Sequence, residues 1–238
     1  MRSTHRGLAS VLVALLWTQA AALCLRALVL LNRIRVAGMI DRHEWVSQAT
    51  ANRADRWVRG ASGLWVLLFA VTIVVWCVWQ HRSHQAARDL VPGMDLSAAW
   101  AVGCWFVPIV SLVKPFQAVR ELWRASEGGP AWREQPTWPV LRWWWATWLG
   151  WNLLGWLAGA TGSADLAAIR RSDLIGLVSV TLGVCAAVLA ARVVRQIESR
   201  LAAMAARAPT ASTSGVHAGL PSPPAPPLPL PPAPGPAG

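Results

Sequence analysis

Two histidines come closest to forming a metal site. His81 and His84 are three residues apart, so a helix would place both imidazoles on one face, and Asp89 follows nearby. A zinc site needs three or four such ligands in fixed positions. No third ligand at a suitable spacing is evident, so the pattern favours two solvated histidines in a basic loop. We therefore expect no bound metal.

The other residue types that could perform catalysis lack the arrangement that catalysis requires. The sequence contains no G-x-S-x-G, H-E-x-x-H, P-loop or dinucleotide-binding pattern. Its four cysteines lie in four different apolar segments and form no C-x-x-C pair; they are Cys24, Cys77, Cys104 and Cys185. We therefore expect no catalytic residue, no cofactor and no enzymatic activity.

Tryptophan is the other unusual residue type, with 17 Trp and no Tyr in the chain. Six of the tryptophans crowd into residues 138–151. An aromatic belt at the lipid headgroups is the simplest interpretation, because there the indole N–H stays hydrated while the ring is buried. The alternative is a cage of aromatic rings around a cation.

The composition indicates that membrane helices carry these residues. Hydrophobic residues make up 55% of the chain and charged residues 14%, whereas a soluble domain has about 25% charged residues. The net charge of +11 could indicate nucleic-acid binding. The arginines flank apolar segments, however, as they do at the ends of membrane helices. We therefore expect a lipid bilayer, and no nucleic acid, as partner.

The apolar segments predict an all-α, polytopic transmembrane bundle over residues 1–207. The five candidate spans are residues 8–31, 61–80, 94–113, 142–160 and 174–191. The third is the weakest because Pro108 lies inside it, and an interfacial position for this segment would leave four spans. The first also resembles a signal peptide, but its apolar run extends beyond the usual signal length. The spacing of apolar residues predicts amphipathic surface helices over about 34–50 and 116–126. For 34–50 the alternative is an extension of the first span into water.

The distribution of positive charge predicts the orientation of the spans. With five spans, 16 of the 22 Lys and Arg residues lie on one side and 6 on the other; with four spans the division is 13 and 9. The positive-inside rule therefore favours five spans. We expect a cell-membrane protein with its N-terminus outside and its C-terminus in the cytoplasm.

Small residues in the last two spans predict close helix packing. Gly155 and Gly159 form a G-x-x-x-G pair, and Gly176 and Gly183 belong to a similar stripe in the last span. Such stripes let helices approach closely. We expect the two spans to pack on each other or on a second copy of the chain.

The last segment, residues 208–238, has a different composition. Ten prolines fall between Pro221 and Pro236. This composition predicts a disordered or polyproline II tail, because so few large apolar residues cannot form a core. Such a tail could bind a partner protein with an aromatic groove. The alternative is an inert spacer.

A cluster of aromatic, proline and charged residues between residues 100 and 126 predicts a structural elbow. The residues are Trp105, Phe106, Pro108, Pro115, Arg120, Glu121, Trp123 and Arg124. The two prolines would bend the chain into the interface, and Glu121 and Arg124 are close enough in a helix to form an ion pair. A functional groove built around the elbow is the alternative.

This cluster resembles the signature of an uncharacterised membrane family that is common in actinobacteria, domain of unknown function 4328. Members of that family have a Trp-rich W-F-x-P stretch, a second proline, and then R-E-L-W-R-A-S. The chain departs from the family pattern at Ser111 and Phe116, where members often have Asn and Tyr. The resemblance implies a membrane protein and implies no specific activity.

Taken without the family, the sequence favours a non-enzymatic membrane scaffold or regulatory partner. The alternative is a channel or transporter for a small molecule or lipid. No Asp, Glu or Lys lies near the middle of a predicted span. Ion-coupled and proton-coupled carriers usually need such groups, so this absence argues against active transport.

Overall fold

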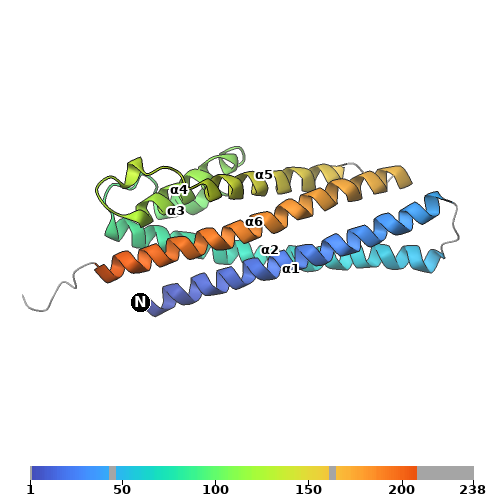
Figure 1. The fold of residues 1–238 in the computed structure, drawn as a ribbon, viewed down its shortest axis with the longest axis horizontal. Coiled ribbons are helices and arrows are strands. Elements are labelled where there is room, and N and C mark those ends of the chain that lie inside the picture. The colour runs from blue at the N-terminus through green and yellow to red at the C-terminus, as the bar shows by residue number, and fades with distance from the viewer. Residues whose placement is uncertain (1, 43–46, 161–164, 208–238) are drawn as a thin grey trace, which may run out of the picture. The chain divides into compact units, whose positions relative to one another are not determined.

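In the computed structural model, residues 2–42, 47–160 and 165–207 are described, and in these residues the only regular elements are helices. The elements are α1 (Arg2–Asp41), α2 (Gln48–Leu90), α3 (Ala98–Gly103), η1 (Val110–Leu112), α4 (Lys114–Glu127), η2 (Trp132–Glu134), α5 (Pro139–Ala160) and α6 (Leu166–Arg207) (Figure 1). The predicted all-helical architecture is confirmed. The predicted tail, 208–238, lies outside the described residues.

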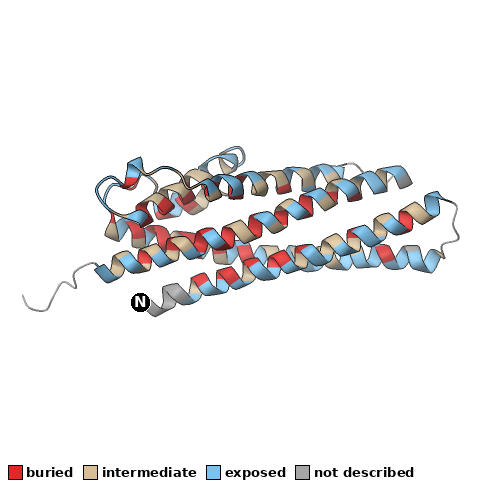
Figure 2. Ribbon diagram, viewed as in Figure 1, coloured by how far each residue is buried: buried red, intermediate tan, exposed pale blue. Residues whose placement is uncertain are grey.

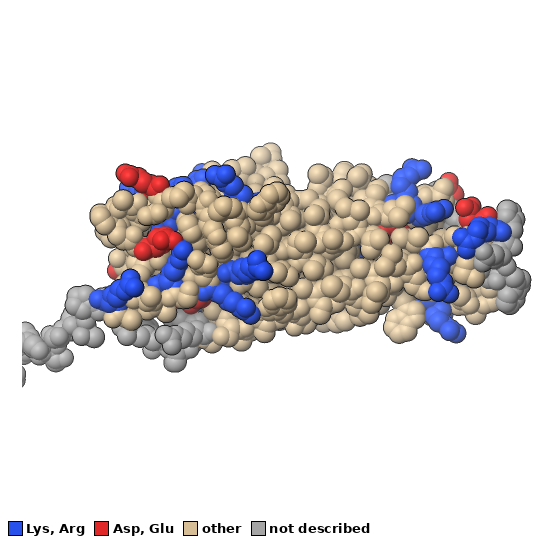
Figure 3. All heavy atoms as spheres, in the orientation of Figure 1, with Lys and Arg blue, Asp and Glu red and all other residues tan. Residues whose placement is uncertain are grey.

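Three of the helices, α1, α2 and α6, are long and apolar enough to cross a membrane. They contain 40, 43 and 42 residues. At 1.5 Å per residue each extends over about 60 Å, roughly twice the hydrocarbon thickness of a bilayer. Charged side chains gather at the two ends of the helical unit and leave an uncharged stretch between them (Figure 3). The long helices can therefore cross the membrane and project beyond it.

Packing between neighbouring helices determines where the core of the helical unit lies. α1 packs against α2 and α6, and α6 packs against α5. Buried and exposed residues alternate along the long helices, as expected for helices that pack on one side (Figure 2). Many large apolar side chains on the other side are exposed, including Leu64, Leu67 and Val74 on α2. This pattern fits helices that face lipid.

The predicted span over residues 94–113 is wrong, because the structure divides this segment. α3 has six residues, and turns separate it from the three-residue η1. Six residues of helix rise only about 9 Å, far less than the bilayer thickness of about 30 Å. Ile109, directly after Pro108, has a positive φ of 67°, which ends any continuous helix here.

The two predicted surface helices have different outcomes. Residues 34–41 continue α1, and residues 48–50 already belong to α2, so a separate helix over 34–50 is wrong. Ile34, Met39 and Ile40, which had suggested an independent surface helix, instead continue the first long helix, and residues 43–46 lie outside the described residues. The segment 116–126 does lie within one helix, α4.

The packing of the first and last helices bears on the predicted sidedness. Ala9 and Leu12, near the start of α1, share one buried cluster with Ile197 and Leu201, near the end of α6. The first and last helices of the unit therefore bring their outer ends to the same end of the bundle (Figure 1). The sides of the membrane on which these ends lie stay a prediction.

The predicted packing glycines occupy different environments. A Cβ on Gly155 would lie 3.3 Å from the Ser179 hydroxyl of α6, and a Cβ on Gly183 would lie 2.9 Å from the Trp151 indole nitrogen of α5. Gly176 instead faces Leu30 of α1, and Gly159 has nothing within 4 Å. Two of the four glycines therefore lie where α5 and α6 approach each other.

Candidate functional site

Gln80 anchors to α2 the broken segment, that is, the segment 94–113 that turns divide into α3 and η1. The side-chain oxygen of this fully buried residue accepts hydrogen bonds from the indole N–H of Trp76 (2.8 Å) and of Trp105 (2.9 Å). Its amide nitrogen donates to the carbonyl of Ala101 in α3 (3.0 Å). One side chain thus fixes both α3 and the Trp105 ring against the second long helix.

Trp105 belongs to a cluster of indole rings that joins α2, the broken segment and α5. Its ring lies 5.5 Å from the ring of Trp148 and 6.0 Å from that of Trp76, both edge to face. Trp76 stacks on Trp144 with ring centres 5.6 Å apart. Such pairs contribute about 0.5–1.5 kcal/mol beyond their buried area. Several tryptophans of the predicted interfacial belt therefore pack inside the bundle, and Trp143 remains exposed.

A cavity of about 350 Å³ lies beside this cluster, between α1, α2, α5 and α6. Seven aromatic residues contribute to its wall, which is otherwise formed mainly by aliphatic and small side chains. The aromatic residues are Phe69, Trp76, Trp105, Phe106, Trp144, Trp148 and Trp151. Two of them, Trp105 and Phe106, come from the motif that the sequence singled out. The motif therefore builds part of the cavity wall.

Gln19 of α1 places an unsatisfied amide at this cavity. The residue is 3% exposed, and neither its amide oxygen nor its amide nitrogen has a hydrogen-bond partner among the residues that the structure describes. Thr72 and Asn152 also line the cavity, but their side chains donate to the helix carbonyls of Leu68 and Trp148. An unpaired buried amide costs about 1–3 kcal/mol. Gln19 thus brings to the wall a buried amide whose donor and acceptor are both free to bind a ligand.

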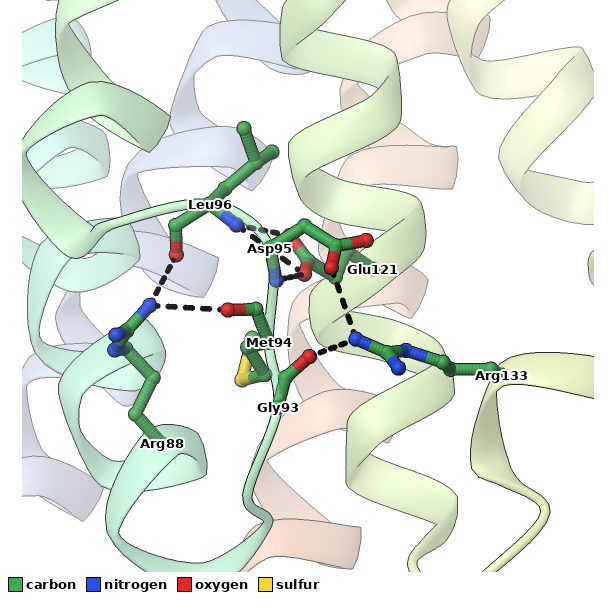
Figure 4. A network of polar contacts seen from close by, with 7 residues as sticks. All are labelled: Arg88, Gly93, Met94, Asp95, Leu96, Glu121 and Arg133. Carbon is green, nitrogen blue, oxygen red and sulfur yellow. Dashed lines mark hydrogen bonds and ion pairs between the residues drawn. The ribbon is translucent and has the colours of Figure 1, made fainter.

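Polar contacts hold the loop that leads into α3 (Figure 4). Glu121 of α4 accepts hydrogen bonds from the backbone N–H groups of Asp95 and Leu96. Arg88 of α2 donates to the carbonyl of Leu96 (2.8 Å) and to that of Met94 (3.3 Å). Burial raises the pKa of Glu121, and the two backbone N–H groups partly oppose that shift. Glu121 therefore accepts hydrogen bonds from a loop backbone, whereas the spacing in the sequence allowed an ion pair with Arg124.

A second arginine completes this network from the other side. Arg133 donates to the carbonyl of Gly93 and to the carboxylate of Asp95 (2.9 Å), as Figure 4 shows. Gly93 has a φ of +85°, a conformation that favours glycine. The network fixes the path of the chain just before α3 and so helps to position Trp105 and Phe106 at the cavity.

The remaining motif residues lie in and around α4. Pro115 is buried in its first turn, where proline is well tolerated. The Trp123 ring stacks on Trp138 at 6.2 Å and carries the Arg200 guanidinium 4.8 Å above it. Arg124 donates to the hydroxyl of Thr137 (3.3 Å). These contacts pack the elbow against the chain that follows it and against α6.

Sequence reasoning missed three buried polar residues. Gln19 is a polar residue inside the apolar run 8–31, but nothing in the sequence indicates that it lines a cavity. Gln80 was the last residue of the predicted span 61–80 and His84 was predicted to be solvated, yet α2 continues to Leu90 and both are fully buried. The prediction of a solvated His84 is therefore wrong. The tryptophans close to Gln80 in the sequence were the available signal that this part of the chain is buried.

Comparison with curated proteins and with solved structures finds no match for this chain. A family model described as a domain of unknown function (DUF4328) matches residues 42–199. The match contains α2 through most of α6, and with them the elbow, the Gln80 contacts and most of the cavity wall. The chain therefore belongs to the DUF4328 family.

Proposed function

We propose that this chain is a four-span protein of the cell membrane that binds an uncharged, amphipathic ligand in its intramembrane cavity. The spans are α1, α2, α5 and α6. Supporting α5 as the fourth span, its 22 residues extend about 33 Å and carry a single charge, Arg142, near the start. With four spans, 13 of the 22 Lys and Arg residues fall on the side of both termini, which favours the cytoplasm.

The observation that carries the ligand proposal is the unpaired amide of Gln19 at an aromatic cavity. The volume of about 350 Å³ lies at the lower end of the range of ligand pockets, roughly 300–1,000 Å³. A mostly apolar wall with a few convergent polar groups is the usual construction of such pockets. A ligand with an apolar body and a hydroxyl, ester or amide group would satisfy Gln19 and fill the space between the rings.

The chemistry of the wall favours an uncharged ligand and binding without turnover. No carboxylate, imidazole, ammonium or guanidinium group occurs among the described residues that line the cavity. Burying an unpaired charge there would be costly. Among the described lining residues, the hydroxyl and thiol groups also have no carboxylate or imidazole that could activate them. These properties support a non-enzymatic lipid-binding or small-molecule-binding protein.

Thermal unfolding of the purified full-length chain in detergent tests this proposal. We expect a monoacylglycerol, which has a neutral hydroxylated head, to raise the Tm of the wild type, and the corresponding fatty acid to have little effect. Gln19→Leu is expected to raise the Tm of the ligand-free protein by a few degrees, because it removes an unpaired buried amide worth about 1–3 kcal/mol. The same variant is expected to lose most of the shift that monoacylglycerol causes.

Two variants of α6 control for effects of the detergent micelle. Ala187 lines the cavity, so Ala187→Phe fills part of it and should abolish the ligand-induced shift. Cys185 is exposed two residues away, so Cys185→Phe adds the same ring outside the cavity and should keep the shift. Equal shifts in all four proteins, or no shift in the wild type, would contradict ligand binding in this cavity.

We also propose a second role, as a scaffold, for the Pro-rich segment 208–238, which lies outside the described residues. Its composition, with ten prolines between Pro221 and Pro236, supports binding to an aromatic groove of a partner protein. A crosslinked pull-down from native membranes can compare the full-length chain with a chain that ends at Ala208. A partner captured only by the full-length chain supports the scaffold role, and equal capture by both chains contradicts it.

A further inference from the structure

A groove beside α4 collects positive charge at one end of the helical unit. It has a volume of about 290 Å³, and α4, the loop at Asp95 and Leu96, and η2 contribute to its wall. The cationic residues that line it are Lys114, Arg120, Arg124 and Arg133, and the anionic residues are Asp95 and Glu121. Four cations thus face two carboxylates.

Both carboxylates of the groove are already occupied. Glu121 accepts hydrogen bonds from two backbone N–H groups, and Asp95 is paired with Arg133 at 2.9 Å. Three cations are left: Lys114, Arg120 and Arg124. None of these three forms an ion pair with a described residue. The groove therefore holds an excess of positive charge that its own carboxylates do not neutralise.

The contacts of two of these cations point to a missing anion. The Nε of Arg124 is buried and has no hydrogen-bond partner among the described residues. Arg120 and Arg124 are one helical turn apart, an unfavourable arrangement for two like charges. Burial, and after it the charge of Arg120, lowers the pKa of Arg124. A bound anion would supply the missing acceptor and relieve the repulsion.

The chain just before α4 indicates where that anion comes from. Four large apolar side chains in this turn are exposed: Phe106 (67%), Ile109 (83%), Leu112 (53%) and Val113 (54%). Ile109 also holds a positive φ of 67°, which a β-branched residue rarely adopts, and its side chain is the most exposed of the four. An apolar turn followed at once by Lys114 matches the boundary between acyl chains and headgroups.

We propose that the α4 groove, defined by Lys114, Arg120 and Arg124, binds the phosphate of an anionic phospholipid headgroup. The apolar turn then lies among the acyl chains beside it, and the three cations face the phosphate. Guanidinium groups suit this role because their planar N–H donors match phosphate oxygens. The site is separate from the intramembrane cavity and differs from it in ligand charge. It also gives a function to Arg120 and Arg124, two residues of the family-like motif.

The test uses the full-length chain, detergent and short-chain lipids, with bound lipid counted by native mass spectrometry. We expect dioctanoyl phosphatidylglycerol to bind the wild type at least tenfold more tightly than dioctanoyl phosphatidylcholine. Arg120→Gln/Arg124→Gln should lose most of this preference. The matched control, Arg82→Gln/Arg192→Gln, removes two exposed arginines from the same end of the unit and should keep it.

One further variant and a competition experiment distinguish this site from the remaining explanations. Lys114 is exposed, so Lys114→Gln should leave the fold intact and still weaken phosphatidylglycerol binding about threefold or more. Equal loss of the preference for phosphatidylglycerol in the groove variants and in the control pair would overturn the proposal, because lipid binding would then follow net charge alone. Competition by inorganic phosphate at the concentration of the lipid would overturn the lipid source and indicate a soluble phosphate compound. Failure of inorganic phosphate to compete supports a lipid headgroup as the bound anion.

Discussion

Arg33→Ala is expected to lower the free energy of unfolding by about 3–5 kcal/mol, because it leaves the Asp173 carboxylate buried without its partner. Asp173 of α6 is 1% exposed, and both of its oxygens accept hydrogen bonds from the guanidinium of Arg33 in α1. The Arg33 Nε lies 2.7 Å from one of these oxygens. Asp55 of α2 lies 3.7 Å from the same guanidinium, so three helices meet at this arginine.

A second ion pair between the same two helices provides the matched control. Arg170 of α6 lies 3.8 Å from Asp41 of α1, and both side chains are more than half exposed. Exposed pairs contribute about 0–1 kcal/mol, so Arg170→Ala should change stability little. Unfolding of the purified proteins in mixed micelles, followed by circular dichroism, measures the effects of both substitutions on stability. Arg33→Ala/Asp173→Asn should recover part of the loss, and equal effects of Arg33→Ala and Arg170→Ala would contradict the account.

Gln80→Leu is the second substitution with a large expected effect. It leaves the indole N–H groups of Trp76 and Trp105 and the carbonyl of Ala101 without the partner that they have in the structure. Each unsatisfied buried group costs about 1–3 kcal/mol, so the total loss should be about 3 kcal/mol or more. The damage should be local as well, because Gln80 holds α3 against α2.

Hydrogen exchange distinguishes this local effect from general destabilisation. The backbone amides of α3, Ala98–Gly103, should exchange faster in Gln80→Leu than in the wild type, and those in the middle of α6 should change less. Gln85 is exposed on the same helix, so Gln85→Leu is the matched control and should leave both stability and exchange nearly unchanged. Unchanged exchange of α3 in Gln80→Leu would show that Gln80 does not anchor it.

Apolar length predicted most of the helical core correctly because it is a local property of the chain. The runs 8–31, 61–80, 142–160 and 174–191 all lie within long helices of the structure. The same reasoning failed for 94–113, since a segment of similar apolar content is divided by turns around Pro108 and Ile109. Lipid and a packed protein interior accept the same residues, so composition alone could not distinguish these cases.

The relative positions of the two ends of the unit and the cavity both depend on contacts between residues that are distant in the sequence. Counting positive charges favoured five spans with the two ends on opposite sides, whereas in the folded unit the start of α1 packs against the end of α6. The amide of Gln19 could be recognised as unusual from its position in an apolar run. Its neighbours from α2, α5 and α6 could not, because they come together only in the folded bundle.

Photo-crosslinking in membranes tests the central claim, that the cavity beside Gln19 holds a neutral amphipathic ligand, most directly. The probe is a monoacylglycerol with a diazirine in its acyl chain, and labelled peptides are identified by mass spectrometry. We predict labelling of the cavity-lining parts of α1, α5 and α6, lost in Ala187→Phe and retained in Cys185→Phe. Labelling confined to lipid-facing residues such as Leu67 and Val74, and equal in all three proteins, would contradict the account.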